Sequence, residues 1–203
     1  HERDGQWLGW EVEELDLPKS VQSSVSRRLD NLSETTRAVA GTAAVIGAQG
    51  YDVSAKDKVV AGLCHYPGQS QPVSGFEKGA MEISERMLRE VFLPPWVAGV
   101  KKAGALGVMA TYPAIDGIPT HASEKILTKI LRGALGFQGL VLGEGSGIDT
   151  IVWEHVAANQ KEAGAIALKA GLDVGISYEA GYMKPLIENV EEGKVSMALI
   201  DRA

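Results

Sequence analysis

Four short apolar runs, each ending in polar or small residues, restrict most strongly how this chain can fold. They lie at 58–66 (KVVAGLCHY), 104–112 (GALGVMATY), 139–144 (GLVLGE) and 171–177 (GLDVGIS). Continuous apolar character is typical of strands that are covered on both faces, as in parallel sheets with crossover helices. The runs therefore predict four parallel strands.

Amphipathic stretches fill the intervals between these runs. Apolar residues recur at helical spacing over 81–92, and the stretch 123–135 opens with a serine that can cap a helix. We expect one or two helices over 148–170, another over 183–190, and an earlier one over 34–48. Strands that alternate with helices predict an α/β fold built from parallel β/α units.

Chemistry-bearing residues stand where each predicted strand ends. These positions are Cys64, His65 and Tyr66, then Thr111 and Tyr112, then Gly143 and Glu144, and finally Ile176 and Ser177. The carboxyl edge of the sheet carries the active site both in closed β/α barrels and in open doubly wound sheets. The spacing thus locates a site without choosing between the two architectures.

Composition and charge exclude several classes of protein. The 203 residues are 45% hydrophobic and carry a formal net charge of -6, without a block of Lys and Arg. This argues against a general partner of nucleic acid or of an anionic membrane, because both need a basic face. No apolar stretch approaches the ~18 residues that span a bilayer. The single cysteine, Cys64, cannot form an internal disulfide.

Four longer stretches carry a family resemblance. They are 61–96 (AGLCHYPGQSQPVSGFEKGAMEISERMLREVFLPPW), 101–119 (KKAGALGVMATYPAIDGIP), 126–144 (ILTKILRGALGFQGLVLGE) and 165–177 (AIALKAGLDVGIS). In this order and spacing they resemble glycoside hydrolase family 3, from its Lys-His sugar-binding strand to the strand after its nucleophile. The resemblance covers residues 34–203.

The resemblance implies a fold and an activity. The fold is a TIM-type (β/α) barrel, incomplete in this chain because a whole barrel takes ~250 residues. We therefore expect an atypical N-terminal segment at 1–33 and a partial barrel domain at 34–203. The family hydrolyses terminal β-linked sugars, such as β-glucosides and β-xylosides, with retention and without a cofactor. Its acid/base glutamate usually comes from a following domain.

The resemblance also assigns roles to four residues. Glu144 occupies the position of the nucleophile, His65 that of the histidine that binds sugar hydroxyls, and Tyr112 borders the terminal-sugar subsite. Cys64 stands in the substrate-binding position where the family has lysine, so a charged donor to the sugar is missing. Glu144 replaces an aspartate and is one methylene longer. Retaining hydrolysis also needs a second carboxyl group ~5–5.5 Å from the nucleophile.

Other interpretations of single motifs are weaker. The glycine-rich turn 143–148 could hold a phosphate at a helix N-terminus, but Ile148 occupies the third glycine position of the dinucleotide fingerprint. No His, Cys, Asp or Glu cluster has metal-ligand spacing, so no metal is expected. We expect Asp116 to be a turn residue before a glycine, and Asp173 to be a structural residue satisfied by backbone donors. His121 and His155 give no reason to assign them a role.

Two functions remain open from the sequence alone. The chain is either a retaining exo-acting β-glycosidase, binding a small β-glycoside or oligosaccharide, or a non-catalytic or repurposed sugar-binding or assembly fragment. Four β/α units cannot close an eight-stranded barrel, and uncovered strand edges tend to be paired. We therefore expect a homodimer or association with the remainder of a barrel. Trp7 and Trp10 are expected to dock on the body of the protein.

Overall fold

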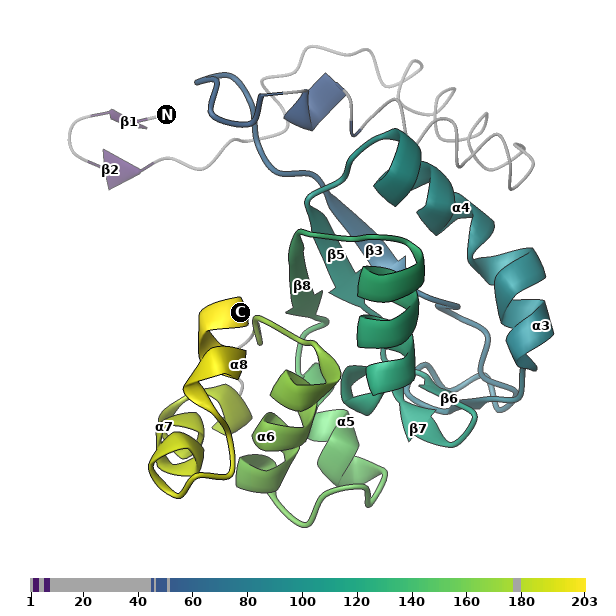
Figure 1. Cartoon of the computed structure of the whole chain (residues 1–203). Helices are drawn as coiled ribbons and strands as arrows, with labels where there is room; N and C mark the ends of the chain where they lie inside the picture. Colours follow the sequence, from purple (N-terminus) through teal and green to yellow (C-terminus); the bar gives the residue numbers. More distant parts are fainter. Residues whose placement is uncertain (1, 4–5, 8–44, 46, 51, 177–179) are drawn as a thin grey trace. The chain divides into compact units, whose positions relative to one another are not determined.

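The computed structural model describes residues 2–3, 6–7, 45, 47–50, 52–176 and 180–203 (Figure 1). The chain divides into two compact units, His1–Arg37 and Ala38–Ala203. In the first unit, β1 (Glu2–Arg3) pairs antiparallel with β2 (Gln6–Trp7). Trp10 and most of the predicted helix over 34–48 lie outside the described residues, although residues 45 and 47–49 are helical.

The core of the second unit is a parallel sheet. Its strands are β3 (Gly62–Tyr66), β5 (Gly107–Ala110) and β8 (Leu140–Gly143), in that order across the sheet. Val174 extends it through a parallel bridge to Leu142 of β8. The strands thus follow one another in space as they do in sequence, which confirms the predicted parallel α/β class and is the arrangement of a barrel segment.

Most of β5 and part of β8 are buried, whereas in β3 only Tyr66 is buried. Val108, Ala110 and Val141 are 0% exposed, as the unbroken apolar runs predicted. The stretch predicted as one or two helices forms two, α5 (Gly147–Trp153) and α6 (Gln160–Ala170). The Asn159 side chain caps α6, and Gly171 ends it with a positive φ of 116°.

Helical segments also connect β3 to β5. The first runs through α3 (Glu85–Met87) into η2 (Leu88–Phe92), and the Ser84 side chain caps its start. The second runs through α4 (Pro94–Val97) into η3 (Ala98–Lys102). The sequence predicted only the first. Paired prolines resemble a helix breaker, yet proline is well tolerated in the first turn, where its missing N–H is not needed.

Three short strands form a small second sheet. In it β4 (Ala80–Met81) pairs parallel with β6 (Ala114–Ile115), which forms a hairpin with β7 (Ile118–Pro119). Asp116 and Gly117 link the hairpin with φ values of 55° and 76°. This confirms Asp116 as a turn residue, since a two-residue hairpin with positive φ at both positions favours Asp-Gly.

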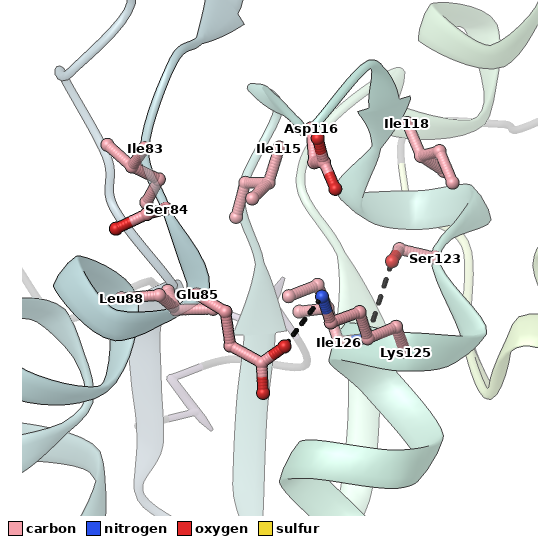
Figure 2. A pocket seen from close by; sticks show the side chains of 10 residues that line it. All are labelled: Ile83, Ser84, Glu85, Leu88, Ile115, Asp116, Ile118, Ser123, Lys125 and Ile126. Carbon is pink, nitrogen blue, oxygen red and sulfur yellow. Dashed lines mark hydrogen bonds and ion pairs between the residues drawn. The ribbon is translucent and has the colours of Figure 1, made fainter.

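The helical segment η5 (Lys125–Ala134) connects β7 to β8 and begins beside the hairpin. The Ser123 hydroxyl accepts the Ile126 N–H at 3.3 Å, as expected for a capping serine (Figure 2). Lys125 and Glu85 form an ion pair at 3.0 Å across a hollow of about 50 Å³. That volume admits a few waters and no sugar ring, so this hollow is not the substrate site.

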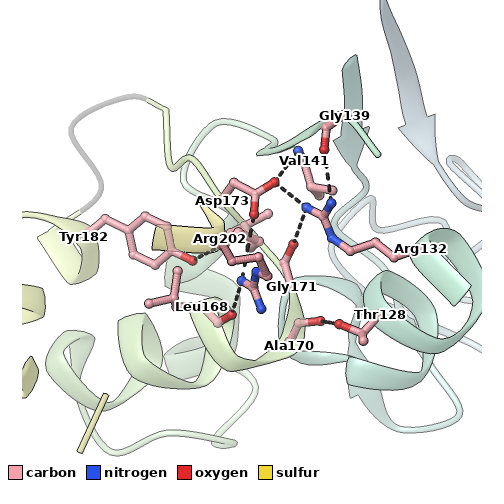
Figure 3. A network of polar contacts seen from close by, with 11 residues as sticks. Thr128, Arg132, Gly139, Val141, Leu168, Ala170, Gly171, Asp173, Tyr182 and Arg202 are labelled. Atoms are coloured by element: carbon pink, nitrogen blue, oxygen red, sulfur yellow. Dashed lines mark hydrogen bonds and ion pairs between the residues drawn. The ribbon is translucent and has the colours of Figure 1, made fainter. Parts of the chain in front are cut away.

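A polar network lies at the amino end of β8 (Figure 3). The Asp173 side chain, 2% exposed, pairs with Arg132 and accepts the Val141 N–H at 2.8 Å. Arg202, in α8 (Met197–Arg202), approaches the second carboxylate oxygen at 3.8 Å. One backbone donor to Asp173 is present as predicted, whereas its two arginine partners were not predicted. The helix α7 (Lys184–Glu191) packs against α6 and has nearly its predicted bounds.

Two further properties concern the partners of the chain. None of the helices in the described part is long and apolar enough to cross a membrane. Among the described residues β3 pairs with β5 alone, and Val59 and Val60, just before β3, are 66% and 51% exposed. The expected homodimer, or association with the remainder of a barrel, stays a prediction.

Candidate active site

The ends of β3 and β8 bring an imidazole and a carboxylate together. His65, in β3, places its Nε2 atom 3.2 Å from Oε1 of Glu144, the residue after β8. The two residues are 79 positions apart in sequence, and they meet because both strands flank β5 in one parallel sheet. The peptide bond between Cys64 and His65 is cis.

Glu144 is held in a mostly buried environment. The residue is 9% exposed, and its Oε2 atom has no hydrogen-bond partner among the described residues. Burial, with the charge of Glu77, raises the pKa of Glu144 to about 7, against the opposing effects of the Tyr112 N–H and of Lys78. A carboxyl group with this pKa changes charge near neutral pH, as expected of a group available for chemistry.

Two of these electrostatic partners come from the loop that follows β3. Glu77 accepts a 2.6 Å hydrogen bond from the side-chain amide of Gln69, whose oxygen accepts in turn from the Thr111 hydroxyl. Lys78 places its Nζ atom 4.6 Å from the centre of the Tyr112 ring. Neither Glu77 nor Lys78 belongs to a motif that predicts a role for it. Their place in the loop after a predicted strand was the one available signal.

The side chain of His121 binds the backbone of Glu144. It is fully buried, and its Nε2 atom accepts the backbone N–H of Glu144 at 3.1 Å. Burial, with the nearby charge of Lys78, lowers the pKa of His121 to about 3, so the ring is neutral and carries its proton on Nδ1. No local pattern singled out this residue, because it lies 23 positions before Glu144 in a short helical turn.

The glycine-rich turn at 143–148 makes room for that imidazole. A Cβ atom at Gly147 would lie 2.1 Å from His121 Nε2, and one at Gly143 would lie 3.5 Å from the ring. The close approach therefore requires glycine at 147. A phosphate-binding role is therefore not needed to explain the glycine at 147.

Tyr112 and Cys64 complete the surroundings of Glu144. The Tyr112 hydroxyl donates to the carbonyl oxygen of Gly145, which ties the end of β5 to the turn after β8. The exposed Cys64 thiol donates to the Gly62 carbonyl at 3.6 Å. Burial and the charge of Glu144 raise the pKa of this thiol, so position 64 lies within electrostatic reach of the carboxylate.

The chemistry available here is that of a carboxylate and its hydrogen-bonding neighbours. Within the described part of the chain, no group of three or more His, Cys, Asp or Glu side chains is placed to hold a metal ion. A carboxylate in this setting can act as a nucleophile or as an acid/base group.

Comparisons with known proteins give the family. The model of the glycosyl hydrolase family 3 N terminal domain matches residues 22–203. A lysosomal beta glucosidase of Dictyostelium discoideum is 36% identical over 168 residues, which are 79% of this chain and 20% of that protein. A beta-xylosidase of Formosa agariphila is 36% identical over 139 residues, 67% of this chain and 19% of that protein.

Solved structures agree in fold. A β-glucosidase from Erythrobacter marinus, with a TM-score of 0.76 and 28% identity, covers 81% of this chain, which spans 22% of that protein. The β-glucosidase of Listeria innocua in complex with glucose has a TM-score of 0.73 and 28% identity over 80% of this chain and 23% of its own. The chain thus spans about a fifth of its relatives' length. It belongs to glycosyl hydrolase family 3, a family of glycoside hydrolases, and its described residues form part of a (β/α) barrel.

Proposed function

We propose that this chain supplies the nucleophile and part of the terminal-sugar subsite of a retaining, exo-acting β-glycosidase. The observation that carries the proposal is the buried Glu144 carboxylate at the carboxyl end of β8, 3.2 Å from His65 Nε2. In a barrel enzyme this edge is the catalytic face. The names of the relatives, β-glucosidases and β-xylosidases, support a terminal β-glucosyl or β-xylosyl unit as substrate.

In the proposed reaction, ionised Glu144 attacks the anomeric carbon and forms a covalent glycosyl-enzyme, while a second carboxyl group protonates the leaving oxygen. Water then hydrolyses the intermediate with the second group acting as base. His65 binds a hydroxyl of the terminal sugar, and Tyr112 borders its ring. His121 fixes the backbone of Glu144, which matters because a displacement near 1 Å can cost ~100-fold in rate.

A second function, sugar binding without hydrolysis, is favoured by two departures from the family's residues. Cys64 offers a weak thiol donor where the family's lysine provides a charged one, and Glu144 reaches one methylene further than the usual aspartate. Both changes alter how a sugar is held relative to the carboxylate. A protein so altered can retain a sugar and still fail to cleave it.

The test is hydrolysis of an aryl β-glucoside and an aryl β-xyloside by the wild-type chain and by Glu144→Gln. The matched control is Glu154→Gln, because Glu154 is another partly buried glutamate whose pKa burial raises to about 7. We expect Glu144→Gln to abolish hydrolysis and Glu154→Gln to retain it. Equal activity in wild type and Glu144→Gln contradicts the proposal. Glucose binding without any hydrolysis supports the second function instead.

A further inference from the structure

The helices α7 and α8 (Figure 1) leave an apolar surface exposed to solvent. On their inner sides, Leu186 and Ile200 pack against the buried Leu168 of α6. A groove of about 550 Å³ opens between the two helices on the outer side. Three apolar side chains that line the groove are more than half exposed, namely Met183, Ile187 and Met197. Contiguous apolar surface in water commonly marks an interaction site.

The groove does not have the lining of a small-molecule site. Of the residues that line it, only Tyr182, Lys184 and Glu191 carry a nitrogen or oxygen atom in their side chains. The Tyr182 hydroxyl donates to the Leu172 carbonyl at 2.6 Å. A small ligand is oriented by several polar groups that converge on it, and this groove offers mainly apolar contact area. Its lining therefore fits the apolar surface of another protein chain.

Two opposite charges flank the apolar part of this surface. Lys184 and Glu191 are the first and last residues of α7, and both line the groove. They are two helical turns apart, so they project from the same side of the helix, about 10 Å from each other along its axis. Ile187 lies between them and is 62% exposed. The Lys184 side chain is 86% exposed, and its contact with Glu188 is long, at 3.9 Å.

A helix face with a positive start, an apolar centre and a negative end is complementary to a reversed copy of itself. A two-fold axis beside Ile187 would set two copies of α7 antiparallel. Lys184 of each copy would then lie beside Glu191 of the other, and the two Ile187 side chains would meet at the axis. A parallel pair would instead place like charges side by side, which is unfavourable. The spacing of the charges therefore selects an antiparallel second copy as the partner.

We propose that the surface of α7 and α8 binds a second copy of this chain through antiparallel contact of the two α7 helices. The apolar side chains supply the affinity, and the two Lys184–Glu191 pairs fix the orientation. The contact surface consists of one short helix and the side of another, which is small for a specific interface. We therefore expect a dimer with a Kd roughly in the micromolar range. The proposal is independent of the proposed hydrolysis.

The first experiment measures the self-association of the whole chain by sedimentation velocity over a range of concentrations. We expect Ile187→Asp to raise the Kd of the dimer at least about tenfold, because it places two like charges at the axis. The control is Val59→Asp, since Val59 is 66% exposed just before β3 and tests pairing through that strand instead. Val59→Asp should leave the Kd unchanged. A wild-type chain that stays monomeric at all concentrations overturns the proposal, as does a dimer that Val59→Asp removes and Ile187→Asp leaves intact.

The second experiment tests the antiparallel orientation by charge reversal. We expect Lys184→Glu and Glu191→Lys each to raise the Kd about tenfold, because two contacts in each dimer become repulsive. An equimolar mixture of the two variants should dimerise as strongly as wild type, since both contacts of the mixed dimer then join opposite charges. The double variant Lys184→Glu/Glu191→Lys should recover self-association for the same reason. Thermal melts check that each variant is folded. A mixture that stays as weak as the single variants, or single variants that associate like wild type, overturns the proposal.

Discussion

Each end of the central sheet has a mostly buried carboxylate, but the two carboxylates differ in how many cationic groups lie against them. At the amino end, Asp173 faces two arginines, Arg132 and Arg202, and also accepts the Val141 N–H. At the carboxyl end, Glu144 meets His65 through one oxygen, and within the described residues no guanidinium or ammonium group forms an ion pair with it. One oxygen of each carboxylate lacks a hydrogen-bond partner there, but that of Asp173 lies 3.8 Å from Arg202. The amino end therefore compensates a buried charge, whereas the carboxyl end leaves one incompletely compensated.

This difference separates a carboxylate that stabilises the fold from one whose ionisation destabilises it. A buried ion pair with additional hydrogen bonds fixes the strand ends and tolerates little change. A carboxylate whose pKa is raised to about 7 by burial and by a like charge destabilises the fold when it ionises. Proteins retain such destabilising groups mainly at functional sites, where the shifted pKa serves binding or catalysis.

The largest expected effect on stability comes from a substitution at the amino end of the central sheet. Asp173→Ala removes the partner of Arg132 and leaves a guanidinium, 18% exposed, without its ion pair. We expect a loss of about 3–5 kcal/mol in the free energy of unfolding, measured by urea denaturation. Asp201→Ala, an exposed aspartate in α8, is the control and should change stability by less than about 0.5 kcal/mol. A similar small loss in Asp173→Ala would mean that the amino end is no better compensated than the surface.

The next effect concerns His121. His121→Ala empties a buried space and leaves the Glu144 N–H without an acceptor, so we expect a loss of about 2–4 kcal/mol. If the chain is an active glycosidase, kcat should fall about 100-fold with a smaller change in KM, because the carboxylate is displaced. The exposed His155 provides the control as His155→Ala, with both values nearly unchanged. A stable His121→Ala chain with normal kcat would contradict the positioning role.

The third effect has the opposite sign. Between the ordinary glutamate pKa of 4.5 and about 7, the folded chain holds a proton on Glu144 that the unfolded chain has lost. The free energy of unfolding therefore falls as pH rises through this window and stays low above it. Glu144→Gln keeps the shape without the charge, so it should be more stable than wild type by about 1–3 kcal/mol at pH 8 and equal to it near pH 4. Denaturation curves at both pH values decide, and a less stable variant at pH 8 would contradict the prediction.

The smallest effect is a shift in a pH profile. If Glu144 is the nucleophile it must be ionised, so the rising limb of kcat/KM against pH should have its midpoint near pH 7. Cys64→Lys introduces an ammonium within electrostatic reach of Glu144, which favours the carboxylate and lowers its pKa. The rising limb should move to lower pH, whereas the uncharged Cys64→Met should leave it in place. Position 64 is exposed, so both variants should fold. Identical profiles for the two variants would contradict the shift.

The sequence by itself determined the parallel β/α units, their order and the edge on which Glu144 and His65 meet. It could do so because buried strands and crossover helices leave local signals, namely unbroken apolar runs and helical spacing. The turn at Asp116 was likewise predictable, since an Asp-Gly pair has a local signature, whereas the arginine partners of Asp173 left none.

Only the tertiary structure decided what surrounds the carboxylate. Three features each join segments that no periodic pattern relates. They are the contact between His121 and the Glu144 N–H, the charges of Glu77 and Lys78 near Glu144, and the ring contact of Phe76 with Trp153. The environment of a buried group depends on every element packed against it, and a pKa or an orphaned oxygen is a property of that environment. Gly147 is the best example of what the sequence alone cannot decide. In the sequence it is compatible with a phosphate-binding loop, but in the structure glycine is required because the His121 ring lies against it.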